Sequence, residues 1–418
     1  MISVRFTRCY PSVSIEGIMT ATSPIIPAPT GEAADFLAVV RDFARDYVRP
    51  RAIVLDCAPA AEFDWDLVRE GTSIGLMRMG IPKEFGGLGL GAVDIATVIE
   101  ELAAADPGVA LIFGGSGLFQ TPIVLSGDAR LQARYLAPFI SDEPVLGCNA
   151  VTEELAGLDL IIPDNAIHAQ NIMAARRDGD RYLLNGTKKF ITNGPLASYA
   201  SVLANMVGHP GATGLTCFIV DLEQPGVTRG PVADKMGYRA CLGGELTFDD
   251  VVVPDENVVG GELGGWKLNI TQSNMCRITC AAVSTGIARA ALEKAIVWCG
   301  ERVQGGKKLY QHQFSAGLLA QMTMKVDAAR LMYLHAAKIA DTGVPCPEYE
   351  PAVAKLFADR AAIEVADAAA SLLGARGYVR DFGMEKILRD SYGPRIYEGT
   401  WQALSILVTE GIYRSDDV

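Results

Sequence analysis

A carboxylate near the C-terminus stands in a setting that could give it catalytic chemistry. Glu398 lies between Tyr397 and Gly399, within the segment R-I-Y-E-G-T-W-Q at residues 395–402, beside a helical stretch. Burial of a carboxyl group raises its pKa, and a raised pKa suits the group to remove a proton from carbon. Composition alone leaves an alternative, in which Glu398 is a solvated acid at the cap of a helix.

Two further segments carry residue types that bind flat cofactors. Phe190 offers an aromatic face, and Thr192 offers a hydroxyl two residues later. The segment from Val151 and Thr152 to Gly157 offers backbone amides and a second hydroxyl, which can bind a ring edge or a phosphate. The alternatives are a core phenylalanine followed by a surface threonine, and a loop of ordinary turn residues.

Composition and missing motifs exclude several classes of protein. The 418 residues are 50% hydrophobic and 21% charged, which excludes a disordered chain. The net charge of -12 argues against nucleic acid or an anionic membrane as the main partner. No Rossmann GxGxxG, P-loop or HExxH motif occurs, so neither such a nucleotide site nor a metal is expected. Nine cysteines without a CxxC pair indicate a reduced, intracellular protein, and no apolar run of membrane-spanning length is expected.

The composition changes along the chain and divides it into regions, which are expected to form the domains that position the candidate residues. Residues 1–31 are expected to form an N-terminal tail, and residues 32–144 a helical domain whose first helix ends at Pro50. Bunched β-rich runs predict a middle antiparallel β domain over residues 145–258 and argue against a doubly wound sheet. Residues 259–418 return to helical periodicity and predict a C-terminal four-helix bundle.

Individual elements of the last two domains can also be predicted. Asp178-Gly179 is typical of a hairpin turn, and Asn185-Gly186 predicts a second tight turn. Strands are expected at 174–177, 181–184, 202–207, 215–221, 245–248 and 251–253. Helices are expected at 277–299, 313–341 and 351–373, with a last helical stretch ending near Tyr413.

The domain order and several short motifs resemble the acyl-CoA dehydrogenase family from about residue 32 to residue 414. The motifs are F-G-G-L-G at 85–89, V-T-E at 151–153, L-N-G-T-K at 184–188, F-I-T-N-G at 190–194, M-G at 236–237, F-D-D-V-V-V-P at 248–254 and I-Y-E-G-T at 396–400. The resemblance implies a mostly α fold with a central β domain, in the order N-terminal helical domain, middle β domain and C-terminal four-helix bundle.

The resemblance also implies a reaction. In this family FAD lies between the β domain and the bundle, and the acyl thioester lies against the flavin ring. Glu398 matches the glutamate that removes the proton α to the thioester carbonyl, while hydride leaves the β carbon for flavin N5. In the family, the backbone N–H of this glutamate and a flavin ribityl hydroxyl bind the thioester oxygen and acidify the α C–H. The implied product is the 2-enoyl-CoA.

Further residues match family positions that contact the cofactor or the substrate. The residues at FAD-binding positions are Val151, Thr152, Gly157, Phe190, Thr192, Arg302, Gln313, Thr400 and Gln402. Arg302 and Gln313 match residues that reach the FAD of a neighbouring subunit, which implies a homo-oligomer, with a tetramer favoured over a dimer. Arg277, expected to open its helix, and Gly399 match substrate-side positions. A salt-bridged helix residue is the alternative for Arg277.

Three departures from the family pattern bear on FAD binding. Leu158 replaces a serine whose hydroxyl would bind an FAD phosphate, Gly305 replaces an aromatic residue, and Ser371 replaces a glutamine. Each lost polar contact costs about 1 kcal/mol. We therefore expect FAD to be bound more weakly or in a rearranged way, rather than to be lost.

The resemblance implies an acyl-CoA substrate and an electron-transfer flavoprotein as electron acceptor. A cytoplasmic location is expected, with neither a nucleic-acid partner nor membrane insertion. The alternatives on the same fold are an oxygen-using or desulfinating flavoenzyme and a dehydrogenase of carrier-protein thioesters. A non-enzymatic homologue should have lost the base, and the presence of Glu398 argues against it. Acyl length, branching and ring content depend on side-chain packing in the pocket.

Overall fold

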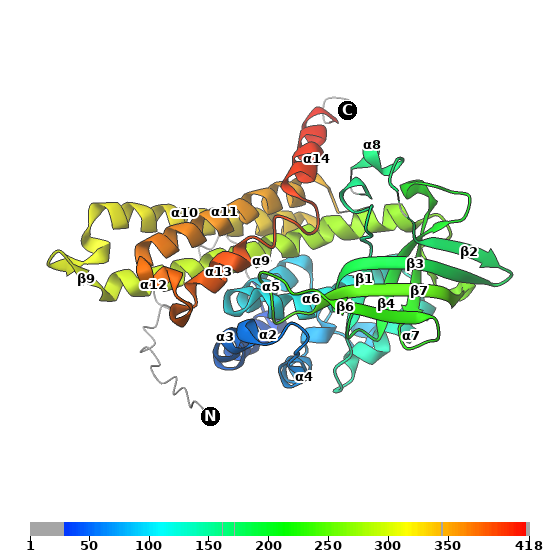
Figure 1. The fold of residues 1–418 in the computed structure, drawn as a ribbon, viewed down its shortest axis with the longest axis horizontal. Helices are drawn as coiled ribbons and strands as arrows, with labels where there is room; N and C mark the ends of the chain where they lie inside the picture. The colour runs from blue at the N-terminus through cyan, green and yellow to red at the C-terminus, as the bar shows by residue number, and fades with distance from the viewer. Residues whose placement is uncertain (1–28, 161, 171, 344–345, 415–418) are drawn as a thin grey trace.

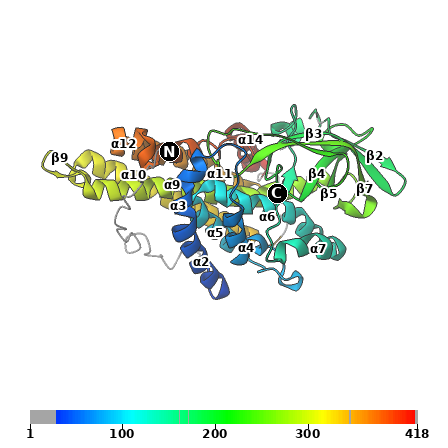
Figure 2. The ribbon, with the colours of Figure 1, turned by 60° about the horizontal axis from the view of Figure 1, so that its bottom comes forward.

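The helical bundle and the β-sheet occupy opposite ends of an elongated molecule, with the N-terminal helices on one side of both (Figures 1 and 2). The computed structural model describes residues 29–160, 162–170, 172–343 and 346–414, apart from the side chains of Leu158, Pro163, Asp164 and Arg414. The expected N-terminal tail lies almost entirely outside the described residues.

The N-terminal domain is helical, as predicted. Its helices are α2 (Glu32–Phe43), α3 (Arg49–Cys57), α4 (Trp65–Ser73), α5 (Ala92–Ala105), α6 (Pro107–Ser126) and α7 (Ala129–Leu136). The prediction that Pro50 ends the first helix is wrong. A π-helical stretch, Ala44–Val48, joins α2 to α3, and Pro50 lies in the first turn of α3. Proline is tolerated there because the first N–H groups of a helix need no intrahelical partner.

Helix α6 corrects another expectation, because it is long and apolar enough to cross a membrane. Most of its residues are buried in the protein, and it packs against α5, α9 and strand β1 (Gly147–Ala150). Phe119 and Ile123 are completely buried. An apolar helix that is mostly enclosed by other elements is a core helix, and its apolar residues pack against the protein interior.

The middle domain is an eight-stranded sheet in which β6, β7, β3, β2, β4, β5 and β8 follow one another and β1 pairs with β4. The other strands are β2 (Ala174–Asp178), β3 (Arg181–Thr192), β4 (Tyr199–Met206), β5 (Leu215–Asp221), β6 (Val227–Val232), β7 (Gly243–Pro254) and β8 (Val258–Val259). Most pairs are antiparallel, as predicted, but β4 pairs in parallel with both β1 and β2. A short helix, α8 (Pro163–Ala166), precedes β2.

Two details of the sheet differ from the prediction. The runs at 245–248 and 251–253 belong to a single strand, β7. Asn185-Gly186 is a bulge inside β3 rather than a turn, because the register against β7 shifts there and Gly186 adopts a φ of 140°. Glycine suits a bulge for the same conformational reason that it suits a turn, so the dipeptide alone does not distinguish the two.

The C-terminal domain contains three long helices that pack together, α9 (Gly265–Glu301), α10 (Gln313–Ala340) and α11 (Tyr349–Leu373). They are followed by α12 (Ala375–Tyr378), α13 (Met384–Ser391) and α14 (Trp401–Arg414). Leu404 and Leu407 of α14 pack on Ala352 at the start of α11. Helix α9 begins well before residue 277, so Arg277 lies inside the helix and does not open it.

Candidate active site

Glu398 lies on the loop between α13 and α14 in a strained conformation. Its φ is 52°, in the left-handed region that non-glycine residues rarely adopt, and Gly399 follows with a φ of 99°. Lys355 of α11 holds this loop, because its Nζ donates to the carbonyls of Pro394 at 2.6 Å and of Gly399 at 3.3 Å. Lys355 also forms an ion pair with Asp359 at 2.7 Å. Such contacts can stabilise a strained backbone at a functional site.

The carboxyl of Glu398 is desolvated although the residue as a whole is half-buried. Burial raises its pKa, and the positive charges of Arg277 and Lys355 together with a hydrogen bond from Cys276 offset part of this effect. A carboxyl with a raised pKa holds a proton more readily and becomes a better base for a proton on carbon. The electrostatic setting is therefore the one that the catalytic hypothesis for Glu398 requires.

Arg277 reaches the same loop from α9 and is completely buried. Its Nε donates to the Glu398 carbonyl at 3.4 Å, and its Nη1 donates to the side chain of Asn274. Its Nη2 has no hydrogen-bond partner, and no ion pair to Arg277 exists among the described residues. Burial lowers the pKa of the guanidinium. The salt-bridged alternative is not observed, and a buried donor without a partner is one that a ligand can satisfy.

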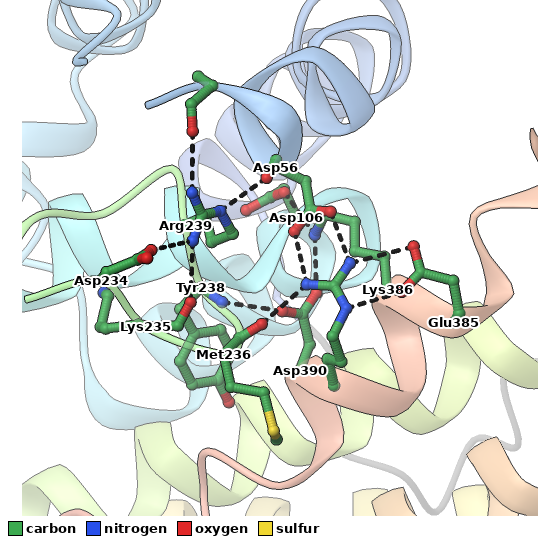
Figure 3. A network of polar contacts seen from close by, with 12 residues as sticks. Asp56, Asp106, Asp234, Lys235, Met236, Tyr238, Arg239, Glu385, Lys386 and Asp390 are labelled. Atoms are coloured by element: carbon green, nitrogen blue, oxygen red, sulfur yellow. Dashed lines mark hydrogen bonds and ion pairs between the residues drawn. The ribbon is translucent and has the colours of Figure 1, made fainter. Parts of the chain in front are cut away.

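Residues from all three domains meet in a polar network (Figure 3). Lys386 of α13 forms ion pairs with Asp106, at the start of α6, at 2.8 Å and with Asp390 at 2.7 Å. Asp390 also accepts the backbone N–H of Tyr238 at 2.8 Å. The hydroxyl of Tyr238 lies 3.4 Å from that of Tyr397, the neighbour of Glu398. This buried network fixes the position of the chain beside the candidate base.

A second group of candidate residues lies at the edge of the β domain, where the loop after β1 meets β3. Lys188 and Glu153 form a buried ion pair at 2.8 Å, and Lys188 Nζ also donates to the carbonyl of Val151 at 2.8 Å. The carbonyl of Thr152 accepts the backbone N–H of Lys189 at 2.9 Å. Burial lowers the pKa of Lys188, and Glu153 offsets part of that effect. The ion pair therefore holds the two predicted flavin segments together.

Three observations show that these residues fit a flat, polar-edged cofactor. Phe190 is 73% exposed with a φ of 59°, so it is not the core residue that composition favoured. A Cβ on Gly157 would touch only the methyl of Thr152, at 3.7 Å, which leaves open space there. The hydroxyl of Thr400 is buried and has no partner. The side chain of Leu158 lies outside the described residues.

Arg302 and Gln313 lie far from this group, at the tip of the bundle opposite the sheet (Figure 1). Both are exposed, and they flank a hairpin of β9 (Val303–Gln304) and β10 (Lys307–Lys308). The local backbone explains why residue 305 is a glycine. Gly305 and Gly306 form the hairpin turn, with φ values of 58° and 80° that favour glycine. Within one chain, these two residues do not join the other candidates.

The remaining candidates take up less constrained positions. Gln402 is exposed in the first turn of α14, and Thr192 is half-buried at the end of β3. Gly399 is buried, and a Cβ there would lie 2.8 Å from Leu404. Ser371 is exposed in the last turn of α11. Gly399 and Thr400 therefore belong to the same loop as Glu398, whereas Gln402 and Ser371 lie on the surface.

Sequence reasoning missed Lys355, Tyr238 and Asp390, which all support the Glu398 loop. The clearest available signal was Lys355, a lysine four residues before Asp359 on a face of α11 that is otherwise rich in alanine. A charged pair at that spacing on a buried face points to a buried ion pair. No comparable pattern linked Tyr238 to Asp390, because they are distant in sequence.

Three domain models cover nearly the whole described chain. Residues 30–143 match the acyl-CoA dehydrogenase N-terminal domain, residues 148–251 the middle domain and residues 264–413 the C-terminal domain. The chain therefore belongs to the acyl-CoA dehydrogenase family of FAD-binding oxidoreductases. The exact boundaries of the domains within this chain stay predictions.

Individual relatives are similar to this chain over nearly its full length. The chain is 32% identical to an acyl-CoA dehydrogenase of Bacillus subtilis (strain 168), covering 91% of this chain and 98% of the relative. It is 34% identical to cyclohex-1-ene-1-carbonyl-CoA dehydrogenase of Geobacter metallireducens, covering 88% and 94%. The solved structure of butyryl-CoA dehydrogenase from Megasphaera elsdenii superimposes with a TM-score of 0.86 at 31% identity, covering 93% and 100%. These relatives support acyl-CoA dehydrogenation by this chain.

Proposed function

We propose that Glu398 is the base that removes the α proton of an acyl-CoA, which this chain converts to the 2-enoyl-CoA. One observation carries this proposal. The desolvated carboxyl of Glu398, with its raised pKa, lies beside the buried guanidinium of Arg277, whose Nη2 has no partner. A base for a C–H proton needs a dry site and fixed positive charge nearby, and both are present.

The other site residues take supporting roles in this proposal. FAD, when bound, supplies the acceptor for the hydride from the β carbon. Phe190, Thr192 and the Val151–Thr152 segment would hold its ring, and Thr400 would donate from the bundle side. The backbone N–H of Glu398 would bind the thioester oxygen and thereby acidify the α C–H. Lys355 would keep that N–H and the carboxylate in place through its contact with the Gly399 carbonyl.

We also propose a cytoplasmic homo-oligomer, with a tetramer favoured, that passes electrons to an electron-transfer flavoprotein. The exposed tip supports the oligomer. Arg302 and Gln313 are exposed on either side of the β9–β10 hairpin, and Phe314, next to Gln313, is an apolar side chain that is 77% exposed. A second chain at this tip would cover the phenylalanine and give Arg302 an FAD phosphate as partner.

The test is anaerobic flavin reduction by a panel of acyl-CoAs that includes butyryl-CoA and cyclohex-1-ene-1-carbonyl-CoA. Glu398→Gln should slow the reduction by roughly 10²- to 10⁴-fold, because the amide cannot accept a proton from carbon. Glu256→Gln, an exposed glutamate paired with Arg134, should react at the wild-type rate. A near wild-type rate for Glu398→Gln would assign the base to another residue. Slow reoxidation by oxygen and an enoyl product separate a dehydrogenase from an oxidase or a desulfinase.

A further inference from the structure

A cavity of about 610 Å³ lies between the N-terminal helices α3 and α5 and the helices α9 and α13. Residues of α3 and of α13 contribute to its lining. Much of its lining is apolar and includes Ile53, Ala104, Ile287, Ala290, Val297 and Trp298. Its volume falls within the range of sites that bind small molecules.

This cavity is distinct from the space beside Glu398, although Lys386 and Asp390 of the supporting network line it. None of the residues predicted to bind FAD or the acyl-CoA lines it. Lys294, which does line it, and Arg277 lie on the same helix, and the 1.5 Å rise per residue separates them by about 25 Å along the axis. A ligand here would not compete for the space beside Glu398.

Lys294 is the unusual group of the cavity, because no hydrogen bond or ion pair involves it within the part of the chain that the structure describes. Burial lowers the pKa of its ammonium, and the positive charge of Arg49 lowers it further. Arg49 already pairs with Glu293 at 2.9 Å. An unpaired ammonium in largely apolar surroundings is costly, and an incoming anion would reduce that cost.

Lys386, a buried cation in the lining of the same cavity, does not share this property. Lys386 lines the same space but pairs with Asp106 and Asp390 within 2.8 Å. Among the described lining residues, Lys294 is the cation left without a counter-ion, and the two lining carboxylates without an ion pair, Glu301 and Asp381, are exposed to solvent. A ligand that complements the cavity must combine an anionic group for Lys294 with a hydrocarbon body for the apolar lining.

We propose that this cavity binds a carboxylate with an unbranched hydrocarbon chain, of the class of a medium-chain fatty acid. The carboxylate lies on Lys294, and the chain lies along Ile287, Ala290 and Val297. Inorganic anions would satisfy the charge but leave the apolar lining in contact with water. A neutral alcohol of the same length would satisfy the lining and leave Lys294 unpaired.

Titration of the FAD-loaded protein with sodium decanoate tests the proposal, by calorimetry and by the fluorescence of Trp298 in the cavity lining. We expect one decanoate per chain, and about fourfold tighter binding for each added CH₂ that is buried. Lys294→Met should weaken binding by tenfold or more, because a charge-assisted hydrogen bond is lost. Lys267→Met, an exposed lysine on the same helix, should bind like the wild type.

Two further arms make the outcome decisive. Decan-1-ol should bind the wild type at least tenfold more weakly than decanoate does, and should bind Lys294→Met and the wild type equally. Ala290→Leu, which fills the cavity without touching the charge, should weaken decanoate binding even if Lys294→Met fails to fold. Absence of binding, equal affinity in Lys294→Met, or displacement of decanoate by excess acyl-CoA would each overturn the proposal. The last result would place decanoate in the acyl-CoA site.

Discussion

The region of α9 around Arg277 and the C-terminal end of the same helix hold their functional groups in opposite ways. Near Arg277, charged and polar groups are buried, some lack partners, and the backbone of Glu398 is strained. At the far end, Arg302 is exposed beside a regular hairpin turn. This difference indicates that a single chain is sufficient to desolvate and orient the candidate base. A phosphate-binding role for Arg302 requires a second chain, because water screens an exposed charge.

The largest change in stability is expected in the buried region around Arg277 and Glu398. Lys355→Met should lower the free energy of unfolding by about 3–5 kcal/mol, because among the described residues it leaves the buried Asp359 carboxylate with Ser284 as its one remaining partner. The same change at the half-exposed pair of Lys325 and Glu364 should cost less than about 1 kcal/mol. Denaturant unfolding of the FAD-loaded protein measures both.

A second variant separates stability from positioning at Lys355. Lys355→Met combined with Asp359→Asn removes the buried unpaired charge and should regain most of the lost stability. Flavin reduction should remain slow, since nothing then holds the carbonyls of Pro394 and Gly399 beside Glu398. Recovery of the wild-type rate in the double variant would show that Lys355 has no role in positioning the base.

The next-largest effect is expected on FAD binding, when the exposed Arg302 at the C-terminal end of α9 is replaced. Arg302→Met should weaken FAD binding by a factor corresponding to about 1.5–3 kcal/mol, the cost of a lost charge-assisted hydrogen bond. The rate of flavin reduction at saturating FAD should change little. Lys307→Met, on the same hairpin, is the matched control. A stable, active, FAD-saturated monomer in sedimentation experiments would show that FAD binding needs no second chain. The proposed difference between the Arg277 and Arg302 regions would then not hold.

A smaller effect is expected from Tyr238→Phe, which removes one hydroxyl and preserves the ring. The lost contact with the Tyr397 hydroxyl is long, at 3.4 Å, and should cost about 0.5–1.5 kcal/mol of stability. If the network positions Glu398, flavin reduction should slow at saturating substrate with an unchanged KM. A changed KM with an unchanged kcat would instead assign Tyr238 to substrate binding.

The last prediction concerns pH rather than a maximal rate. Because burial raises the pKa of Glu398, flavin reduction should increase with pH through a pKa above the ordinary value of 4.5. Arg277→Met removes a charge that favours the carboxylate, so the increase should move to higher pH. Lys267→Met should leave the profile unchanged. An unshifted profile for Arg277→Met would show that the guanidinium does not act on the base.

Stability should depend on pH in the corresponding direction. The folded pKa of Glu398 is raised above the unfolded value, so the folded state holds the proton more tightly. The free energy of unfolding should therefore decrease as pH rises from about 4.5 through the folded pKa, and Glu398→Gln should lose this part of the dependence. Comparison of unfolding curves for the two proteins across this range provides the check.

Local signals in the sequence predicted much of the fold. Helical periodicity gave α10 and α11 to within a few residues, and the turn at Asp178-Gly179 gave the β2–β3 hairpin. The errors fell where one local pattern fits two structures. Asn185-Gly186 suits either a turn or a bulge, and Pro50 suits either the end of one helix or the first turn of the next.

The candidate site could be predicted less completely than the fold. Short motifs identified Glu398, Phe190 and Arg277, but the groups that hold them in place were found only in the structure. Tyr238 and Asp390 lie 152 residues apart and meet through a single backbone hydrogen bond. No periodicity connects such residues, because their contact depends on how the β domain packs against α13.

The sequence by itself determined the family, the three-part order of domains and the identity of the candidate base, because these depend on residue types and on spacings along the chain. Only the tertiary structure decided that Glu398 is desolvated, that Arg277 is buried with an unpartnered donor, and that Arg302 is exposed. The physical reason is that burial and electrostatic environment arise from groups that are distant in sequence. Desolvation and neighbouring charge set a pKa, and both are properties of the packed molecule.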